Sequence, residues 1–523
     1  MLKNHWFFYD FWKTSIWATG PLNTLSWSPE RSILDPQREP KSSPKRFQIG
    51  SESPPLPHPH PSLPCPPGSR LGCGLFQTKQ FDQWKCLVPY LYDWLANHNL
   101  VWPTQCCRWG PPLGPAGDCK QAHRVYVSEQ TDGSEPNKLV VARADVVRPR
   151  VAAAESIASF REVDGSPFVQ PLKTILHPGE VNKIRELPAY SDRLLATHTD
   201  APDVFLWDVE AQPAYTKGSW AEPTPDLVLK GHTDIAPFAL GASCAPGSGR
   251  LASGGRDALV VVWDAGDLAS SLAGRAAGGA GVGAGAGAAG GGQTLEARYK
   301  LSGHDAQVED VVFKPGCDHE LASVGDDRAL LFWDTRARGG DKPTVSVPGA
   351  HGDDVQCLDW AASDPHLLVT GSADSSVHVW DTRKLGGAGA GALHEFQGHR
   401  GSVLRVQWHP LQPGVFASGG EDALLNVWDL GGAAGASASS RIQEYHGAPP
   451  GLLFQHCGHR DNIVDFQWNQ SDPWTLLSVS DDTSAGGGGA LQMWRINDLI
   501  YRPQAEVLAE LEQYKDFILT GKD

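Results

Sequence analysis

Four sets of His, Ser or Thr, and Asp recur along the chain, and each set taken alone has the residue types of a nucleophilic catalyst. In each set a His precedes a Ser or Thr, an Asp follows four residues after the hydroxyl, and a Trp follows six residues after the Asp. A hydroxyl, an imidazole and a carboxylate are the components of a hydrolase triad. A catalytic triad is needed only once, so a set that occurs four times indicates a repeated structural unit. The sets are His232, Ser253, Asp257 and Trp263; His304, Ser323, Asp327 and Trp333; His351, Thr370, Asp374 and Trp380; and His399, Ser418, Asp422 and Trp428.

Each set is therefore predicted to be a buried polar network. A buried imidazole, hydroxyl, carboxylate and indole N–H all need hydrogen-bond partners, and these four groups can satisfy one another. The fixed spacing then follows because all four must arrive at the same place. We assign no catalytic residue, and the sequence predicts that the protein is not an enzyme.

The repeated unit extends beyond these four sets. A Trp-Asp dipeptide also stands at 207, a Trp-Arg takes its place at 494, and a Gly-His lies upstream of most units. Between these marks run short aliphatic or β-branched stretches bounded by Gly, Asp or Ser, which is typical of short antiparallel strands. Four strands per unit make one blade of a β-propeller, and this is the WD40 pattern.

Counting the units predicts a closed ring. Six units end at Trp residues between 207 and 494, and a seventh must come from residues before 177. Candidate strands for it are 124–127 and 139–142. Because an open propeller would leave an unpaired edge, we expect residues 105–109 to supply a closing strand to the last blade. The predicted fold is all-β: a seven-bladed WD40 β-propeller over 100–499 with flanking N- and C-terminal α-helices.

The flanks and inserts differ from the repeats. Residues 1–79 are rich in Pro and are predicted to be a disordered extension, with a mistaken gene start as the alternative. Residues 273–292 are almost wholly Gly and Ala and are predicted to form a loop. Accidental GxGxxG matches in this loop lack the strand and helix of a dinucleotide site. Apolar residues at helical spacing predict an N-terminal helix over 80–99 and a C-terminal helix over 500–523.

Composition excludes several classes of function. The formal net charge of -16 argues against direct DNA binding, which needs a basic surface, but it suits a partner that is a basic peptide. No apolar run is long enough for a transmembrane helix, so no membrane contact is expected. The ten Cys residues contain no CxxC pair, and no metal site and no cofactor are predicted.

Several stretches resemble one family. LYDWLANHNLVWP (91–103), HPGEVNKIRELP (177–188), GHRDNIVDFQWNQSDPW (458–474) and LQMWRINDLIYRP (491–503) are similar to the MSI and retinoblastoma-associated histone-binding WD40 proteins. EQTDGSEPNKLVVA (129–142) and RVAAAE (150–155) resemble the plant FVE branch of that family. The resemblance implies a non-catalytic scaffold subunit of histone deacetylase or Polycomb-type complexes, linked to transcriptional repression. It implies a nuclear location, with the cytoplasm as a second one.

The same resemblance implies two surfaces for histones. A histone H3 tail would lie on the top face of the ring, and a histone H4 helix would dock in a groove beside the N-terminal helix. Two top-face positions that are acidic in animal members are Ile235 and Ser402 here, and Glu444 is the only carboxylate near the groove loop, so both contacts are expected to be weakened. The residues implied for H3 are Glu180, Asn182, Glu309, Asp326 and Asp354. Those implied for H4 are Leu91, Leu95, Pro449, Pro450 and Phe454.

Two WDxR motifs, ending at Arg336 and Arg383, suggest another partner. In WD40 proteins of this kind such an Arg can dock on the DDB adaptor of cullin ubiquitin ligases. The alternative function is therefore a substrate receptor, and the structural alternative is that each Arg is a surface residue at the end of a blade.

Overall fold

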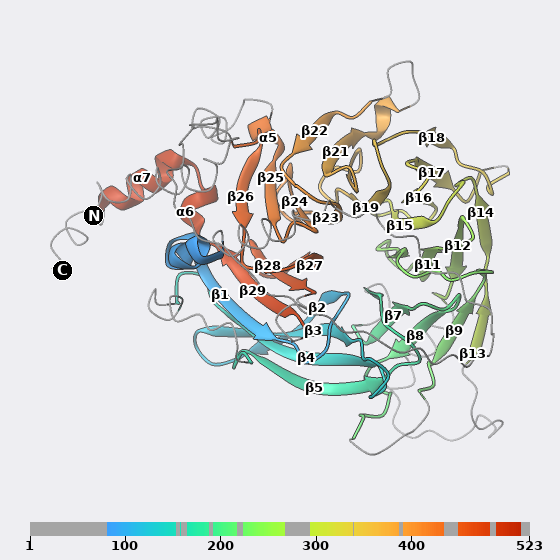
Figure 1. Ribbon diagram of the computed structural model, residues 1–523, viewed down its shortest axis with the longest axis horizontal. Coiled ribbons are helices and arrows are strands. Elements are labelled where there is room, and N and C mark those ends of the chain that lie inside the picture. The colour runs from blue at the N-terminus through green and yellow to red at the C-terminus, as the bar shows by residue number, and fades with distance from the viewer. Residues whose placement is uncertain are drawn as a thin grey trace, which may run out of the picture.

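Seven β-sheets surround a central axis in the computed structural model, which confirms the seven-bladed propeller (Figure 1). The structure describes residues 81–152, 157, 165–187, 192–216, 223–266, 293–337, 339–385, 391–433, 448–481 and 488–513. Several predicted features lie outside these residues: the extension 1–79, the loop 273–292, Glu444 and the chain after 513. Each blade begins with the strand nearest the axis, because consecutive inner strands contact one another all the way round, from β2 back to β2 through β27.

The first three blades use the strands before residue 303. The first blade comprises β2 (Cys107–Pro115), β3 (Lys120–Glu129), β4 (Lys138–Val147) and β5 (Val169–Leu176). The second comprises β6 (Lys183–Glu186), β7 (Leu194–His198), β8 (Val204–Asp208) and β9 (Leu227–Lys230). The third comprises β10 (Leu240–Ala242), β11 (Arg250–Gly254), β12 (Leu259–Asp264) and β14 (Tyr299–Ser302). The strands predicted at 124–127 and 139–142 lie within β3 and β4, so the origin of the seventh unit is confirmed.

The remaining blades follow the WD40 units. The fourth comprises β15 (Val308–Phe313), β16 (Glu320–Gly325), β17 (Leu330–Asp334) and β18 (Val345–Val347). The fifth comprises β19 (Val355–Trp360), β20 (Leu367–Ser372), β21 (Ser376–Asp381) and β22 (His394–Gln397). The sixth comprises β23 (Val403–Trp408), β24 (Val415–Gly420), β25 (Leu425–Asp429) and β26 (Leu452–His456). The seventh takes β27 (Ile463–Trp468), β28 (Thr475–Ser480) and β29 (Ala490–Ile496) from this part of the chain.

The ring is closed by an N-terminal strand, but not by the segment predicted. Strand β1 (Tyr92–Asn99) pairs antiparallel with β29 and completes the seventh blade. The predicted closing segment 105–109 instead leads into β2, the inner strand of the first blade. The helix predicted over 80–99 is wrong in extent, because residues 81–91 are helical and 92–99 are a strand. The sheet takes the backbone there: the carbonyl of Leu91 accepts the N–H of Asn497, 2.9 Å away.

A repeated clamp joins neighbouring inner strands. In three successive joints a Trp donates its main-chain N–H to an Asp or Gln side chain of the preceding blade, and its indole N–H to the main-chain carbonyl of that same residue. The last of these joints connects the seventh blade to the first, so it reinforces closure of the ring. The pairs are Trp408 with Asp359, Trp468 with Gln407, and Trp109 with Gln467.

Between the second and third strands of four blades, the network Asp builds a tight turn. One carboxylate oxygen accepts the N–H two residues ahead, as Asp327 does from Ala329 at 3.0 Å. The other accepts the N–H of the residue after the network His, as Asp327 does from Asp305 at 3.0 Å. The residue directly after each Asp has a positive φ, which the turn imposes on a non-Gly side chain at some cost. These residues are Ala258, Arg328, Ser375 and Ala423.

The third blade sends an extra strand onto its neighbour. Strand β13 (Gln293–Glu296) pairs in parallel with β9, so the sheet of the second blade has five strands. The chain then continues into β14 of the third blade. An outer sheet edge is thereby covered by a strand from the adjacent unit.

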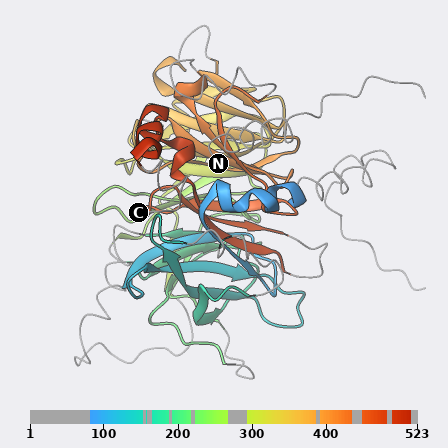
Figure 2. The same ribbon diagram turned by 90° about the vertical axis from the view of Figure 1, so that its left-hand side faces the viewer.

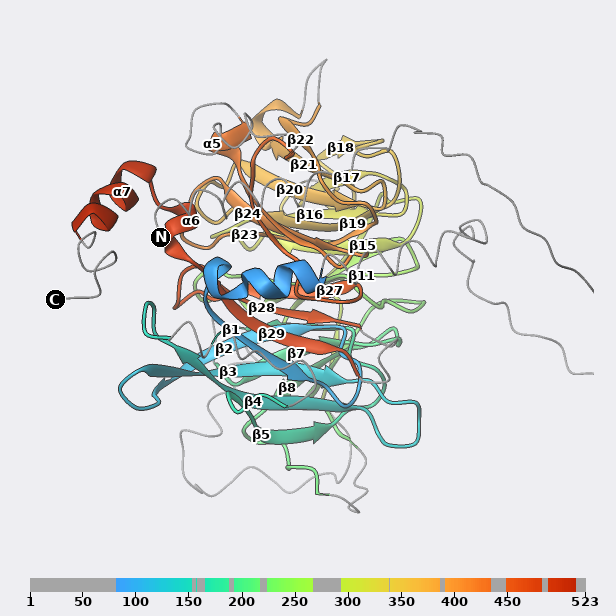
Figure 3. The same cartoon turned by 60° about the vertical axis from the view of Figure 1, so that its left-hand side comes forward.

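Helical segments flank the seventh blade. The helix over 81–91 lies along that blade, and Phe81, Trp84 and Val88 enter a hydrophobic cluster with its strands (Figure 2). After β29 the chain forms α6 (Asp498–Tyr501) and α7 (Gln504–Gln513), and α7 extends outward from the ring (Figure 3). Within the described part of the chain, no helix has the length and apolar character needed to cross a membrane.

Candidate functional site

The four predicted networks lie in the blades as expected, and their hydroxyls are buried. Each His contacts its Ser or Thr through Nε2 at 2.6–2.7 Å. In three networks the Trp Nε1–H also donates to that hydroxyl, at 2.8–2.9 Å. The exception is Trp263, which donates to the main-chain carbonyl of Lys230 at 2.9 Å. Since these hydroxyls are fully buried and already bonded, the arrangement favours a structural role over that of a nucleophile.

The Asp of each network responds to its His. Burial alone would raise the pKa of Asp327, but the hydrogen bond from His304 and two main-chain N–H groups hold it below the ordinary value. Asp257 and Asp422 are lowered in pKa by the same balance. The fifth blade differs, because Ser376 lies between His351 and Asp374, 3.0 Å from the imidazole and 2.5 Å from the carboxylate.

Two further networks were not predicted from the sequence. His177, Thr197 and Trp207 join in the second blade, with the hydroxyl 2.8 Å from each partner. In the seventh blade Ser478 contacts His459 at 2.7 Å and Trp494 at 3.1 Å. The Gly-His at 458–459 signalled the second of these. The spacing rule missed both because the Asp turn of each unit is altered.

Three of the predicted H3-binding carboxylates come together at one mouth of the ring. Glu309 lies at the start of inner strand β15, Asp326 in the turn between β16 and β17, and Asp354 just before β19. Burial, and then the charge of Asp326, raise the pKa of Glu309 to about 8. Burial and the charge of Asp354 raise the pKa of Asp326 to about 6. We call these three residues the acidic mouth. It is short of positive charge, which is what a carboxylate cluster with raised pKa values indicates.

The other two predicted H3-binding residues belong to the second blade. Glu180 is exposed, whereas Asn182 is buried and accepts a hydrogen bond from Gln130 at 3.0 Å. The neighbouring Lys183 acts electrostatically on Glu309, so this segment faces the same mouth. The structure does not bring Glu180 or Asn182 into contact with the acidic mouth, because the third blade lies between.

Glu421 is a carboxylate that the sequence reasoning missed. Ser402 was expected to mark a lost acidic position, but its hydroxyl donates to Glu421 Oε2 at 2.9 Å. Glu421 stands directly before the network Asp422, as Asp326 stands before Asp327. That equivalence of position is the signal that could have found it. The sixth blade therefore offers a carboxylate in the equivalent turn.

Below the acidic mouth, the inner strands bury a network of charges. Arg405 pairs with Asp310 at 3.3 Å and with Asp465 at 3.2 Å, and all three side chains are at most 5% exposed. Burial would raise the pKa of Asp465, but Arg108 and Arg405 lower it. Burial, and then the charge of Arg405, lower the pKa of Lys183. These residues come from the first, second, fourth, sixth and seventh blades, so the network links inner strands around the axis.

The predicted apolar lining of the H4 groove needs correction. Phe454 is fully buried and packs edge-on against Tyr92, and Leu91 and Leu95 are also buried in the same cluster. Leu95 lies on a strand, paired with Trp494, rather than on a helix, so its side chain enters the core. These three side chains cannot form an exposed groove wall. Of the predicted set, Pro449 is half-buried and Pro450 is exposed.

The two WDxR arginines are exposed on the face opposite the acidic mouth. Asp334 and Asp381 end β17 and β21, whereas Asp326 lies at the other end of β17. Each guanidinium folds back onto its own motif: Arg336 Nε lies 3.3 Å from Asp334, and Arg383 Nη2 lies 2.9 Å from Asp381. The two side chains are 63% and 61% exposed and lie on adjacent blades.

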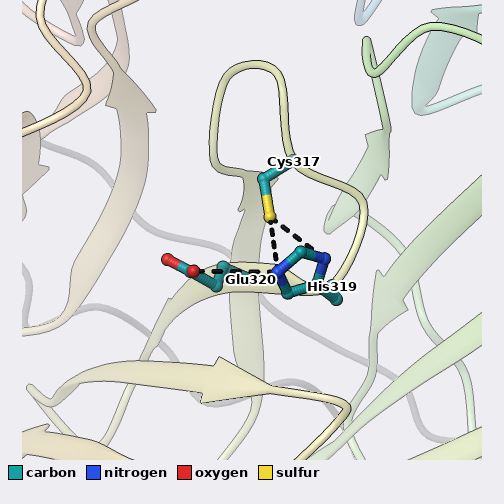
Figure 4. A group of neighbouring side chains, drawn as sticks. All are labelled: Cys317, His319 and Glu320. Carbon is teal, nitrogen blue, oxygen red and sulfur yellow. Dashed lines mark hydrogen bonds and ion pairs between the residues drawn. The ribbon is translucent and has the colours of Figure 1, made fainter.

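A cluster of possible metal ligands was also missed. Cys317, His319 and Glu320 lie in and after the turn between β15 and β16, and their ligand atoms are all within 4.8 Å of one another (Figure 4). The search for CxxC pairs could not find it, since it combines three residue types within four positions. The sequence prediction of no metal site overlooked this group.

Comparison with known proteins identifies related chains. The family of the histone-binding protein RBBP4, also a component of the CAF1 complex, matches residues 79–148, which include the N-terminal helix, β1 and the first blade through β4. The WD domain, G-beta repeat, matches residues 295–334, 342–381 and 391–429. The WD-40 repeat-containing protein MSI4 of Arabidopsis thaliana is 50% identical over 449 residues, which is 84% of this chain and 86% of that protein.

Proposed function

The chain belongs to the MSI and RBBP4-like family of WD40 proteins, and from that premise we propose that it is a histone-binding scaffold that performs no chemistry itself. The observation that carries this proposal is the acidic mouth. Three carboxylates are held close together there, and two of them have pKa values raised to about 8 and about 6. A Lys or Arg side chain placed among them would relieve their repulsion, so the mouth suits a cationic peptide such as a histone H3 tail.

Histone H4 is the second proposed ligand. The helix over 81–91 presents Asp82, Lys85 and the 56% exposed Tyr90 outward, and the Pro449–Pro450 segment lies on the same blade pair. With Leu95 and Phe454 in the core, the outer face of this helix is mostly polar. Binding there would depend on charge and on Tyr90 more than on an apolar groove.

As a scaffold of this kind, the protein would present histone tails to an enzyme partner. We place it in the nucleus, as a subunit of histone deacetylase or Polycomb-type complexes that repress transcription. Affinity purification from nuclei followed by mass spectrometry tests this assignment: recovery of neither class of complex would contradict it.

Binding of an H3 amino-terminal peptide, followed by fluorescence anisotropy, tests the mouth directly. Glu309→Gln and Asp326→Asn should each weaken binding about tenfold or more, because a charge-assisted contact contributes about 1.5–3 kcal/mol. Glu395→Gln, on the outer strand β22, is the matched control and should bind like the wild type. Equal affinity of all four proteins would exclude the mouth as the binding site.

A substrate receptor for a cullin ligase is the second candidate function. The observation that favours it is the pair of exposed WDxR arginines on adjacent blades, at the face that the acidic mouth leaves free. The two functions are compatible, since the two surfaces are separate.

A further inference from the structure

The turn between β15 and β16 gathers a sulfur, a nitrogen and an oxygen donor on consecutive parts of the chain. Cys317 Sγ lies 3.2 Å from His319 Nε2 and 3.3 Å from His319 Nδ1. His319 Nε2 lies 3.8 Å from Glu320 Oε1. Neither the acidic mouth nor the WDxR proposal uses these side chains. Thiolate, imidazole and carboxylate together are a donor set that Zn²⁺ prefers.

The spacing of the donors fits one metal ion. With Zn–S of about 2.3 Å and Zn–N and Zn–O of about 2.0–2.1 Å, a tetrahedral site has S–N edges of about 3.5 Å and N–O edges of about 3.4 Å. The separations of 3.2 Å and 3.8 Å differ from these edges by a few tenths of an ångström. Rotation of the His319 and Glu320 side chains, which are 20% and 34% exposed, can supply that adjustment.

The groups behind the donors are also arranged as in a metal site. Asp318 Oδ1 lies 3.1 Å from His319 Nδ1, so a proton on Nδ1 would leave the Nε2 lone pair for a metal. Lys314 donates to Glu320 Oε2 at 2.5 Å, which leaves Oε1 as the oxygen that faces the imidazole. Carboxylate–histidine pairs and hydrogen-bonded carboxylates of this kind orient the ligands of metal sites.

We propose that Cys317, His319 and Glu320 bind a zinc ion, with water at the remaining position. On binding, the Cys317 thiol releases its proton to solvent, and the imidazole coordinates in its neutral form. The site would stiffen the end of the fourth blade, because the main-chain carbonyl of His319 accepts the N–H of Thr335 at 2.9 Å. Thr335 directly precedes the WDxR residue Arg336, so metal occupancy would steady that segment.

Titration with Co²⁺ alone, followed by competition with Zn²⁺, tests the proposal on the full chain. The wild type should develop a near-ultraviolet thiolate-to-cobalt charge-transfer band that saturates at one equivalent and is removed by Zn²⁺. Cys317→Ser should lose this band, and His319→Gln should lose or strongly weaken it. Asp318→Asn should keep the band with about 10–100-fold weaker affinity, as expected for a group that orients a ligand.

The control is Cys119→Ser, which removes an exposed thiol in the first blade and should leave the titration unchanged. Cys65 and Cys73 lie outside the described residues, so the relevant signal is the difference between the wild type and Cys317→Ser. Circular dichroism of the metal-free proteins checks that the variants fold. A band of equal intensity in Cys317→Ser, or no thiolate band in the wild type, would overturn the proposal.

Discussion

The hydroxyl oxygen of Tyr92 lies 2.6 Å from Nδ1 of His456, which joins the closing strand β1 to the last strand of the sixth blade. The direction of the bond follows from its neighbours. Gln492 donates its amide N–H groups to Asn97 and Gly458, so its Oε1 must accept from His456 Nε2. Burial lowers the pKa of His456 well below its ordinary value, so the ring is neutral and its Nδ1 accepts from Tyr92. The Tyr92 oxygen in turn accepts from Trp84 Nε1 at 2.8 Å.

Tyr92→Phe should therefore destabilise the fold by about 1–3 kcal/mol, because it leaves a buried donor on Trp84 and a buried acceptor on His456 without a partner. Tyr90→Phe removes a hydroxyl from a 56% exposed side chain nearby and should have little effect. Urea denaturation of both variants measures the difference. Equal free energies of unfolding would show that this chain of bonds does not hold the closing strand.

The unusual bond of Trp263 predicts a difference between two similar substitutions. Ser323→Ala would leave both His304 and the indole N–H of Trp333 without their partner. Ser253→Ala would leave only His232, because Trp263 donates to a main-chain carbonyl. Ser323→Ala should thus cost about 1 kcal/mol more than Ser253→Ala in the free energy of unfolding. The reverse order would mean that the indole bond contributes nothing.

The acidic mouth predicts a pH-dependent affinity for cationic peptides. At neutral pH the carboxyl of Glu309, with its pKa raised to about 8, holds a proton, and Asp326 titrates near 6. A bound Lys or Arg favours the ionised forms, so affinity for an H3 peptide should increase as the pH rises from 6 to 9. Glu309→Gln should bind more weakly at pH 9 and lose the part of the increase above pH 7. A flat profile in the wild type would contradict this reading of the mouth.

Buried neutral histidines predict loss of stability in mild acid. Burial lowers the pKa of His177, His198 and His459 to about 3, against 6.5 for an ordinary histidine. Below pH 6.5 the unfolded chain binds protons that the folded chain does not, so the stability present above 6.5 is lost as the pH falls toward 3. Each such His contributes up to about 1.4 kcal/mol per pH unit in this window. Urea denaturation at pH 7.5 and pH 5 measures the effect, and equal stability would contradict it.

The WDxR candidate predicts a selective loss of one partner. Arg336→Ala together with Arg383→Ala should abolish capture of the DDB adaptor, while H3 peptide affinity stays the same because the mouth lies on the opposite face. Arg298→Ala, another exposed Arg that pairs with an Asp, is the matched control. Pull-down with purified adaptor measures the result, and unchanged capture by the double variant would exclude this docking mode.

The repeat and the ring were predictable because buried polar networks need fixed residue types at fixed spacing. The count of seven blades followed from Trp positions and from two apolar stretches before residue 177. The closing strand was mispredicted, because the apolar spacing of Leu87, Leu91 and Leu95 suits a helix and only pairing with β29 turns 92–99 into a strand. Tertiary pairing overrode the local pattern there.

The sites were less predictable than the fold. The electrostatic coupling of Glu309, Asp326 and Asp354 followed from positions carried over by resemblance, and no local pattern in the sequence marked it. The burial of Leu95 and Phe454 could not be read from their apolar character, which suits a core and a groove equally. Glu421 and the Cys317 cluster needed the positions of turns, which depend on where each strand ends.

Strand β1 also sets the order in which the molecule can mature during synthesis. Residues 92–99 leave the ribosome early, but their partner strand, residues 490–496, is almost the last part to be translated. Until then the nascent ring stays open, with the edge of β1 unpaired and available to chaperones or to other chains. A premature stop codon anywhere before residue 490 would leave that edge exposed for good, so shortened translation products should be cleared or aggregate rather than retain partial activity.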